Sequence, residues 1–333
     1  PRPNLFEVSN DPTRKRLEVR QPILKNSDLD KIKYIGEISD SHFTSKVLDT
    51  TYNADKGPSG MGTSIQALCD KAVRSVLNGD NIIILSDRLF GSDRIAIPAL
   101  LATAAVHHHL IRKGLRTSVG IVVESAEPRE VHHFAVLAGY GAEAINPYLA
   151  FDTLSDMHSK DLFPKGVDQD QVVNRYIKSI DKGLLKVMSK MGISTYQSYC
   201  GAQIFDAVGL STEFIDQFFT GTATQIEGIG LKEVAEETFR RHSQAYSDVA
   251  VLRHALDVGG DYAVRRRGET HAWTSDEVTS LQHAVRGNSK DQYNYFSQLI
   301  NEQSERLLTI RGLFKLRSAE ERGKRPVDIS KVE

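Results

Sequence analysis

The segment Asn81-Ile-Ile-Ile-Leu85 decides how the first half of this chain folds. Its uninterrupted apolar residues predict a strand that is buried on both faces, as is typical of parallel sheets. Similar runs stand at 45–52, 117–123 and 142–146, and amphipathic helical patterns separate the four runs at 64–78, 98–112 and 128–138. This alternation predicts an α/β fold of parallel βα units, either half of a barrel or a small doubly wound sheet.

The regular alternation stops in a polar stretch at 151–171, which contains Pro164 and Gly166. We expect a domain boundary there, with one domain at 1–170 and a second at 171–333. The second half is predicted to be mainly helical. Its helical patterns stand at 171–186, 202–208, 212–219, 231–247 and 275–286. The last of these follows Thr274-Ser-Asp-Glu277, which is a capping-box pattern.

Composition limits the classes of partner. The 42 basic and 43 acidic residues give a net charge of −1, which predicts no nucleic-acid and no membrane partner. The longest apolar stretch, at 95–106, is too short to span a bilayer. The two cysteines, Cys69 and Cys200, cannot form a disulfide framework, and no signal peptide is recognisable. These features predict a cytoplasmic protein.

Polar residues follow the predicted strands where each strand ends. Ligands of parallel sheets gather at the carboxyl ends of the strands, so these residues form one charged rim. They either bind a polar metabolite or pair with each other and fasten this half to a neighbouring domain. We favour the fastening role, because no nucleophile and base stand at a recognisable spacing. The rim residues are Ser86, Asp87, Arg88, Glu124 and Asn146.

Two other patterns suggest sites but lack the necessary spacing. The histidines of His107-His-His109 and His132-His133 have no partner histidine three or four residues away, so packing between helices is favoured over metal binding. The glycine-rich loop at 57–62 precedes a helix but matches no phosphate-binding motif. We interpret it as a connection with a helix N-cap at Thr63 or Ser64, with a phosphate site as the alternative.

A set of motifs in collinear order resembles the large chain of glutamate synthase, and the resemblance covers nearly the whole chain. Together these motifs are far more specific than any one alone. They include Ile84-Leu-Ser-Asp-Arg88, Val131-His-His-Phe134, Ala138-Gly-Tyr-Gly-Ala-Glu-Ala-Ile-Asn-Pro-Tyr148, Lys186-Val-Met-Ser-Lys-Met-Gly-Ile-Ser-Thr195 and Gly268-Glu-Thr-His271.

The resemblance implies that 1–170 is the central connecting domain and that 171–333 is the opening part of an FMN-binding (β/α)8 synthase domain. Intact family members hold FMN and a 3Fe-4S cluster, and they make glutamate from glutamine-derived ammonia and 2-oxoglutarate. Here Pro1 stands where the amidotransferase domain has a cysteine, and the cluster cysteines and later barrel strands are absent. We therefore expect no catalytic residue, no metal site and no cofactor held by this segment alone.

One cofactor contact follows from the resemblance. If residues 185–192 form the first barrel strand, its end borders the flavin and 2-oxoglutarate; a helix followed by a turn is the alternative interpretation of the same residues. The candidate residues are Lys190, Met191, Gly192, Ile193 and Ser194.

The expected partners are the amidotransferase and remaining synthase domains of the same parent chain, with an electron-donating subunit or ferredoxin for the whole enzyme. NADPH, NADH and ferredoxin remain open as the electron source. A eukaryotic source would place the protein in an organelle matrix. Two other functions remain open, a stand-alone scaffold or docking protein built from the central domain and a small enzyme that uses the rim.

Overall fold

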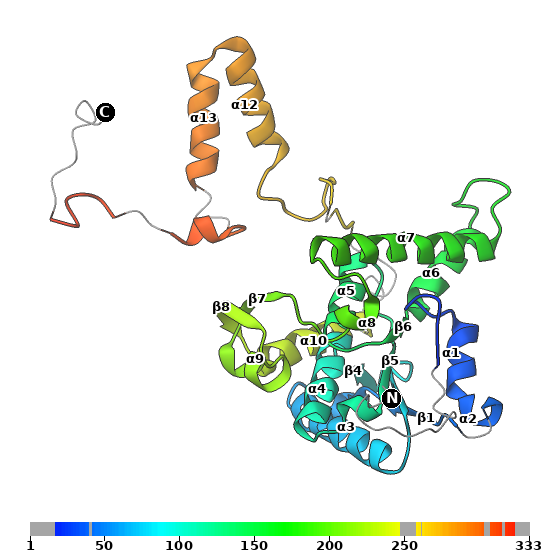
Figure 1. Ribbon diagram of the computed structural model, residues 1–333. Helices are drawn as coiled ribbons and strands as arrows, with labels where there is room; N and C mark the ends of the chain where they lie inside the picture. The colour runs from blue at the N-terminus through cyan, green and yellow to red at the C-terminus, as the bar shows by residue number, and fades with distance from the viewer. Residues whose placement is uncertain are drawn as a thin grey trace. The chain divides into compact units, whose positions relative to one another are not determined.

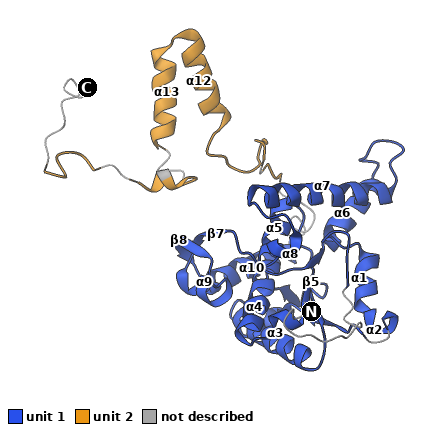
Figure 2. Cartoon of the chain, viewed as in Figure 1, with its two compact units in different colours: residues 1–248 blue, residues 249–333 orange. Residues whose placement is uncertain are grey.

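The computed structural model describes residues 17–39, 42–246, 258–260, 262–302, 307–314 and 317–323. Pro1 lies outside these ranges. The chain divides into two compact units, residues 1–248 and residues 249–333 (Figure 2). No helix in the described ranges combines the length and apolar character that a membrane span requires.

A four-stranded parallel sheet organises the first unit (Figure 1). Neighbouring strands are paired in parallel throughout, so the predicted sheet is confirmed. The four strands follow one another across the sheet in chain order, and Ile23, in the segment before the first helix, forms a parallel bridge with Ile145 on the outer side of β6. The sheet is open, with no closed barrel among the described residues. The strands are β1 (Ser45–Asp49), β3 (Ile82–Ser86), β5 (Gly120–Glu124) and β6 (Ala144–Asn146).

Each face of the sheet has its own hydrophobic core. Alternate residues of β3 point to opposite faces, so Ile83 and Leu85 join the larger core whereas Ile82 and Ile84 join the smaller one. The crossover helices α3 (Gly60–Leu77), α4 (Ala99–Arg112) and α5 (Val131–Gly139) contribute to the larger core. The helices α1 (Asn26–Lys33) and α2 (Ile35–Ile38) contribute to the smaller core.

Short elements complete the carboxyl side of β1. The strand predicted at 45–52 is split, because the chain continues after β1 into β2 (Thr51–Asn53), which pairs antiparallel with β4 (Arg94–Ala96). A 3-10 turn, η1 (Ala54–Lys56), then leads to α3. Helix α3 begins at Gly60 with Ser59 as N-cap, so the N-cap predicted at Thr63 or Ser64 is wrong.

Helices and a second sheet form the rest of the first unit. The predicted helix at 202–208 is wrong, because Asp206–Leu210 forms β7, which pairs in parallel with β8 across the intervening α9. The polar stretch after β6 also contains a helix, α6. The elements are α6 (Tyr148–Ser159), α7 (Gln169–Lys190), α8 (Tyr196–Tyr199), β7 (Asp206–Leu210), α9 (Thr212–Phe218), β8 (Ala223–Ile229) and α10 (Leu231–Ala245).

The described part of the second unit contains the helices α12 (Ser275–Gly287) and α13 (Lys290–Asn301) and the 3-10 turn η4 (Ile310–Leu313). The predicted capping box is confirmed, since Thr274 and Glu277 cap each other at the start of α12. The domain boundary predicted at 170/171 remains a prediction about a longer family member. Within this chain, α7 packs against α5 and α6 in the first unit.

Candidate functional site

The polar rim predicted from the sequence lies at the carboxyl edge of the parallel sheet. Strand register places Ser86 beside Glu124, and Glu124 beside Asn146. Asp87 and Arg88 follow directly after β3. We call Ser86, Asp87, Arg88, Glu124 and Asn146 the carboxyl-edge cluster. The structure brings these five residues together because the parallel strands all end at the same edge.

Glu124 is the centre of one half of the cluster. Its side chain is 1% exposed and accepts hydrogen bonds from Ser86 Oγ at 2.7 Å, Arg88 Nε at 2.8 Å and Lys33 Nζ at 3.0 Å. Burial by itself would raise the pKa of Glu124, but these three donors hold it below the ordinary value. Glu124 is therefore ionised at neutral pH, and it ties β3 and β5 to α1.

Asp87 is the centre of the other half. Its carboxylate accepts hydrogen bonds from Ser125 Oγ at 2.6 Å, Tyr148 Oη at 2.7 Å and the Ala126 amide at 3.1 Å. Burial outweighs these donors and raises the pKa of Asp87. Arg88 lies 4.0 Å from the centroid of the Tyr148 ring, so a cation–π contact joins the two halves.

Asn146 connects the cluster to the start of α1 and the segment just before it. Its Nδ2 donates to the carbonyl of Leu24 at 2.9 Å and to Asn26 Oδ1 at 3.0 Å. The hydroxyls of this cluster that lie beside its carboxylates belong to Ser86, Ser125 and Tyr148, which are 5%, 1% and 4% exposed, so these residues offer almost no surface to a substrate. Chemically the cluster is a set of mutual pairs that braces the edge of the sheet.

The predicted flavin-edge residues form a helix end. Residues 185–190 belong to α7, so the strand interpretation of 185–192 is wrong and the alternative of a helix followed by a turn is correct. Leu185 is 55% exposed because it lies on the outer face of that helix. The amide of Gly192 donates to Ser189 and that of Ile193 donates to Met188, which closes the helix.

Within this turn, Gly192 has a φ of 70°, which favours glycine. A Cβ placed on Gly192 would meet no atom within 4 Å, and Met191 is 47% exposed. Ile193 points back to the protein and packs with Met188 and Tyr199. Lys190, Gly192 and Ser194 are exposed, so one side of the turn is open to a ligand or another domain.

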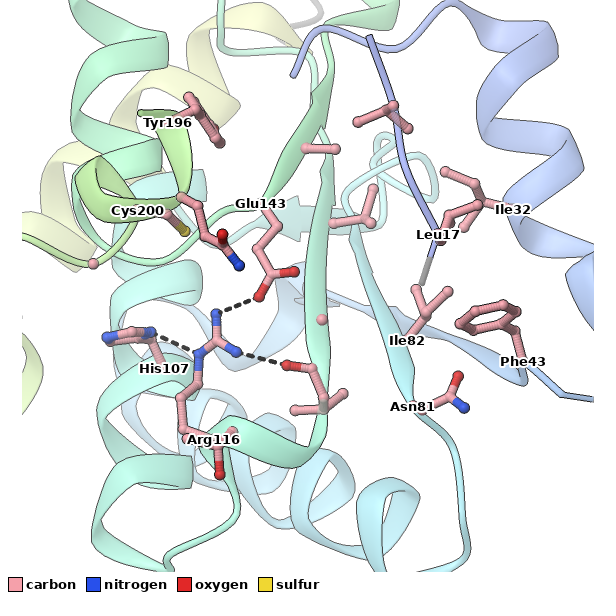
Figure 3. Close-up of a pocket in the computed structure, with 18 of the residues that line it drawn as sticks. Leu17, Ile32, Phe43, Asn81, Ile82, His107, Arg116, Glu143, Tyr196 and Cys200 are labelled. Atoms are coloured by element: carbon pink, nitrogen blue, oxygen red, sulfur yellow. Dashed lines mark hydrogen bonds and ion pairs between the residues drawn. The ribbon is translucent and has the colours of Figure 1, made fainter. Parts of the chain in front are cut away.

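A cavity of about 660 Å³ lies at the amino end of the parallel sheet, opposite the carboxyl-edge cluster. Figure 3 shows Arg116 between His107 of α4 and Glu143, which precedes β6. Arg116 donates to His107 Nδ1 at 2.9 Å, to the Val119 carbonyl at 2.6 Å and to Glu143 Oε1 at 3.2 Å. Sequence analysis missed this group, since an arginine after a helix carries no signal of its partners.

Two of the histidines, His107 and His108, pack between elements, whereas His132 is exposed. His107 is 7% exposed and His108 5% exposed, and His108 Nε2 lies 2.7 Å from Gln203 Nε2. Burial lowers the pKa of His107 to about 3 and that of His108 to about 4, with further lowering from nearby arginines. No group of three metal-ligating side chains occurs in the described ranges.

Comparison with known proteins gives one family. Residues 1–211 match the family model for the glutamate synthase central domain. The chain is 40% identical over 319 residues to the glutamate synthase [NADPH] large chain of Bacillus subtilis. The aligned region covers 96% of this chain and 20% of that protein. The chain is 36% identical over 314 residues to the glutamate synthase [NADH] of Schizosaccharomyces pombe, covering 94% of this chain and 15% of that protein.

A third relative is the chloroplastic ferredoxin-dependent glutamate synthase of Oryza sativa, at 37% identity over 344 residues, covering 100% of this chain and 20% of that protein. The chain thus spans a fifth or less of the length of these three relatives. The family resemblance found in the sequence motifs is confirmed.

Proposed function

Since the chain belongs to the glutamate synthase central-domain family, we propose that it forms the segment of a glutamate synthase large chain that links the amidotransferase and synthase sites. The parent is an oxidoreductase of glutamate biosynthesis and ammonia assimilation, which makes glutamate from glutamine-derived ammonia and 2-oxoglutarate. The segment is inactive by itself. Its partners are the other domains of the same parent chain, in the cytoplasm or an organelle matrix.

One observation carries this proposal. Relatives named for NADPH, NADH and ferredoxin all match nearly the whole chain at 36–40% identity. A role shared by enzymes with three electron sources does not include recognition of the donor. Connection between sites is such a role, and the carboxyl-edge cluster supports it, because its charges pair internally and stiffen the sheet. Arg88, whose side chain is 41% exposed, is its outermost charge and the candidate contact to a neighbouring domain.

The residues present do not fit a complete FMN or 3Fe-4S site. The 3Fe-4S cluster needs three cysteines, whereas the chain has two. Cys69 is buried in α3, and Cys200 lies beside the cavity at the amino end of the sheet. For FMN, the turn of residues 190–194 offers an open edge without a cradle for the phosphate. We therefore assign FMN and the iron–sulfur cluster to the parent enzyme. This turn ends a helix and not the first barrel strand, and its resemblance to the family motif together with its open side supports a contact at the edge of the flavin and 2-oxoglutarate.

The first test is the intact mass of the protein isolated from its source. The proposal expects a species several times heavier than the 37.1 kDa of this chain, because the chain matches a fifth or less of its relatives. A mature 37.1 kDa protein would instead support the alternative function, a stand-alone scaffold or docking protein.

The second test separates a flavin contact from a structural turn in the intact parent enzyme. Gly192→Asn adds a side chain to the open edge, and asparagine tolerates a positive φ better than valine or alanine. Gly166→Asn is the matched control, since Gly166 also has a positive φ, 84°, and open space around its Cβ position. The proposal expects lower flavin content or glutamate formation in the Gly192 variant alone, with unchanged glutamine hydrolysis.

A further inference from the structure

The cavity of about 660 Å³ at the amino end of the parallel sheet has two unlike halves. Figure 3 shows Ile32 and Phe43 on one side of the sheet and His107 and Arg116 on the other. The first half is walled by apolar side chains, several of which belong to the smaller core, whereas the second half carries polar groups. A volume of roughly 300–1,000 Å³ is typical of small-molecule sites.

Gly120, the first residue of β5, allows the two halves to form one space. It lines the cavity and has no side chain to divide it. A Cβ at Gly120 would lie 3.1 Å from Glu143 Oε2, so the carboxylate of Glu143 lies directly over the start of the strand. The cavity therefore continues from one face of the sheet to the other across the amino end of β5.

The walls of the cavity keep exposed hydrophobic surface. Leu17, Val19 and Ile111 line it and are 45%, 42% and 49% exposed. Removing such surface from water is favourable, and apolar side chains around a concave wall are a common feature of ligand sites. These walls suit the apolar body of a ligand.

The polar half offers a hydrogen-bond donor, the Nε2 proton of His107. His107 accepts from Arg116 at Nδ1, so the proton of its neutral ring is on Nε2. The residue is 7% exposed, and its Nε2 has no hydrogen-bond partner among the residues that the structure describes. Some unpartnered polar atoms of the described residues are fully buried, His109 Nε2 among them, but His107 Nε2 is not one of these and keeps accessible surface.

Gly201 marks the direction in which this donor points. It also lines the cavity, and a Cβ placed on it would lie 3.6 Å from His107 Nε2. A nearly buried N–H without an acceptor is unfavourable, so it indicates an acceptor on a ligand. Glu143 already balances the charge of Arg116, at 3.2 Å, and would repel a second carboxylate. The acceptor that fits this half is therefore neutral.

We propose that this cavity binds a small neutral molecule with an apolar ring body and a carbonyl oxygen or ring nitrogen, which accepts a hydrogen bond from His107 Nε2. The ring body covers the exposed side chains of Leu17 and Val19. This inference is independent of the proposed function, because it requires neither flavin nor another domain.

The test is fluorescence titration of the 333-residue chain with prodan, a neutral dimethylaminonaphthalene ketone, and with the same dimethylaminonaphthalene without its ketone. We expect saturable binding of both probes, tighter for prodan. His107→Asn should raise the Kd of prodan about tenfold, the effect of losing one hydrogen bond, and leave that of the second probe unchanged. Asparagine keeps an acceptor for Arg116 near the Nδ1 position and places no atom near Nε2.

A second variant tests the location. Gly120→Val fills the space between the two halves, valine suits a strand, and Glu143, whose side chain is 50% exposed, can move aside. Gly120→Val should raise the Kd of both probes by about tenfold or more. Gly287→Val is the matched control, because a Cβ at Gly287, in α12, meets no atom within 4 Å. It should leave both Kd values unchanged.

Each outcome decides the inference. Absence of saturable binding by both probes overturns it. Equal Kd values in Gly120→Val and the unsubstituted chain place the probes elsewhere and also overturn it. If prodan binds equally well to His107→Asn, the ketone does not use His107 and the proposed chemistry is wrong. If a variant is unfolded, the NMR resonance of His107 Nε2 with and without prodan decides instead, and an unchanged resonance contradicts the inference.

Discussion

Arg116 Nε donates a hydrogen bond to His107 Nδ1 at 2.9 Å. A guanidinium is always protonated, so Nδ1 must be the acceptor and His107 must be neutral, with its proton on Nε2. Arg116 also donates to the carbonyl of Gly141, at 2.9 Å. One arginine thereby joins the carboxyl half of α4 to the loops before β5 and β6, and its geometry requires an uncharged histidine.

This requirement predicts that stability decreases in mild acid. The pKa of His107 is about 3 in the folded chain and 6.5 ordinarily, so between these values only the unfolded chain takes up the proton. Stability is therefore lost as pH falls from 6.5 towards 3. His107 should contribute a loss of about 2 kcal/mol between pH 6.5 and 5. Urea unfolding of the unsubstituted 333-residue chain and of its His107→Gln variant at both pH values measures this contribution.

Glutamine is chosen because its Oε1 can still accept from Arg116 but does not titrate in this range. His132→Gln is the control, since His132 is an exposed histidine on α5. The pH dependence should be smaller in His107→Gln and unchanged in His132→Gln. An identical pH dependence in all three proteins would contradict the neutral, buried state of His107.

Glu124→Gln should destabilise the first unit by about 2 kcal/mol at pH 7, because it removes a buried carboxylate that pairs with Arg88 and Lys33. The pKa of Glu124 is lowered, so its stabilising contribution is present above the ordinary value of 4.5 and is lost as pH falls through the folded value. The difference between the two proteins in unfolding free energy should therefore shrink below about pH 4.5.

Glu37→Gln is the matched control, because Glu37 is an exposed glutamate on α2. It should change the unfolding free energy by less than about 0.5 kcal/mol. If Glu124→Gln behaves like Glu37→Gln, the carboxyl-edge cluster does not brace the sheet.

Gly183→Ala should destabilise the chain although alanine favours helices. In an open helix this change is stabilising by about 1 kcal/mol. Here a Cβ at Gly183, in α7, would lie 2.2 Å from Val131 Cγ2, in α5, and such overpacking costs about 1–3 kcal/mol. Thermal unfolding should show a lower midpoint for the Gly183→Ala variant than for the unsubstituted 333-residue chain.

The same substitution made together with Val131→Ala should be neutral or stabilising relative to Val131→Ala, because the space for the new methyl group is then free. If Gly183→Ala alone has a higher midpoint than the unsubstituted chain, α5 and α7 do not pack as closely as the structure has them.

The 333-residue chain should not retain FMN, because the flavin contact proposed for the turn of residues 190–194 is a single exposed edge, which would bury little of the cofactor. The measurement is visible absorbance after the chain is mixed with FMN and desalted. A yellow chromophore retained in near-equal ratio to protein would mean that the flavin site has been misplaced.

Local sequence was sufficient to predict those helices and strands whose sequence patterns lie within a few neighbouring residues. The apolar run of β3 and the capping box at Thr274 each lie within a few residues, so the strand and the start of α12 were predicted correctly. The carboxyl-edge cluster was predictable for a similar reason, since parallel strands bring their ends to one edge. The patterns failed at residues 185–192 and 202–208, because short apolar runs are compatible with both a helix and a strand.

The sequence by itself determined the family, the parallel order of the first four βα runs and the polar character of their carboxyl edge. Only the tertiary structure decided which distant side chains contact one another. Asp87 meets Tyr148 from 61 positions away, Arg94 meets Asp49 from 45, and the buried Tyr52 hydroxyl has no hydrogen-bond partner among the residues that the structure describes. Distant pairs and missing partners depend on how whole elements pack, and no local periodicity encodes them.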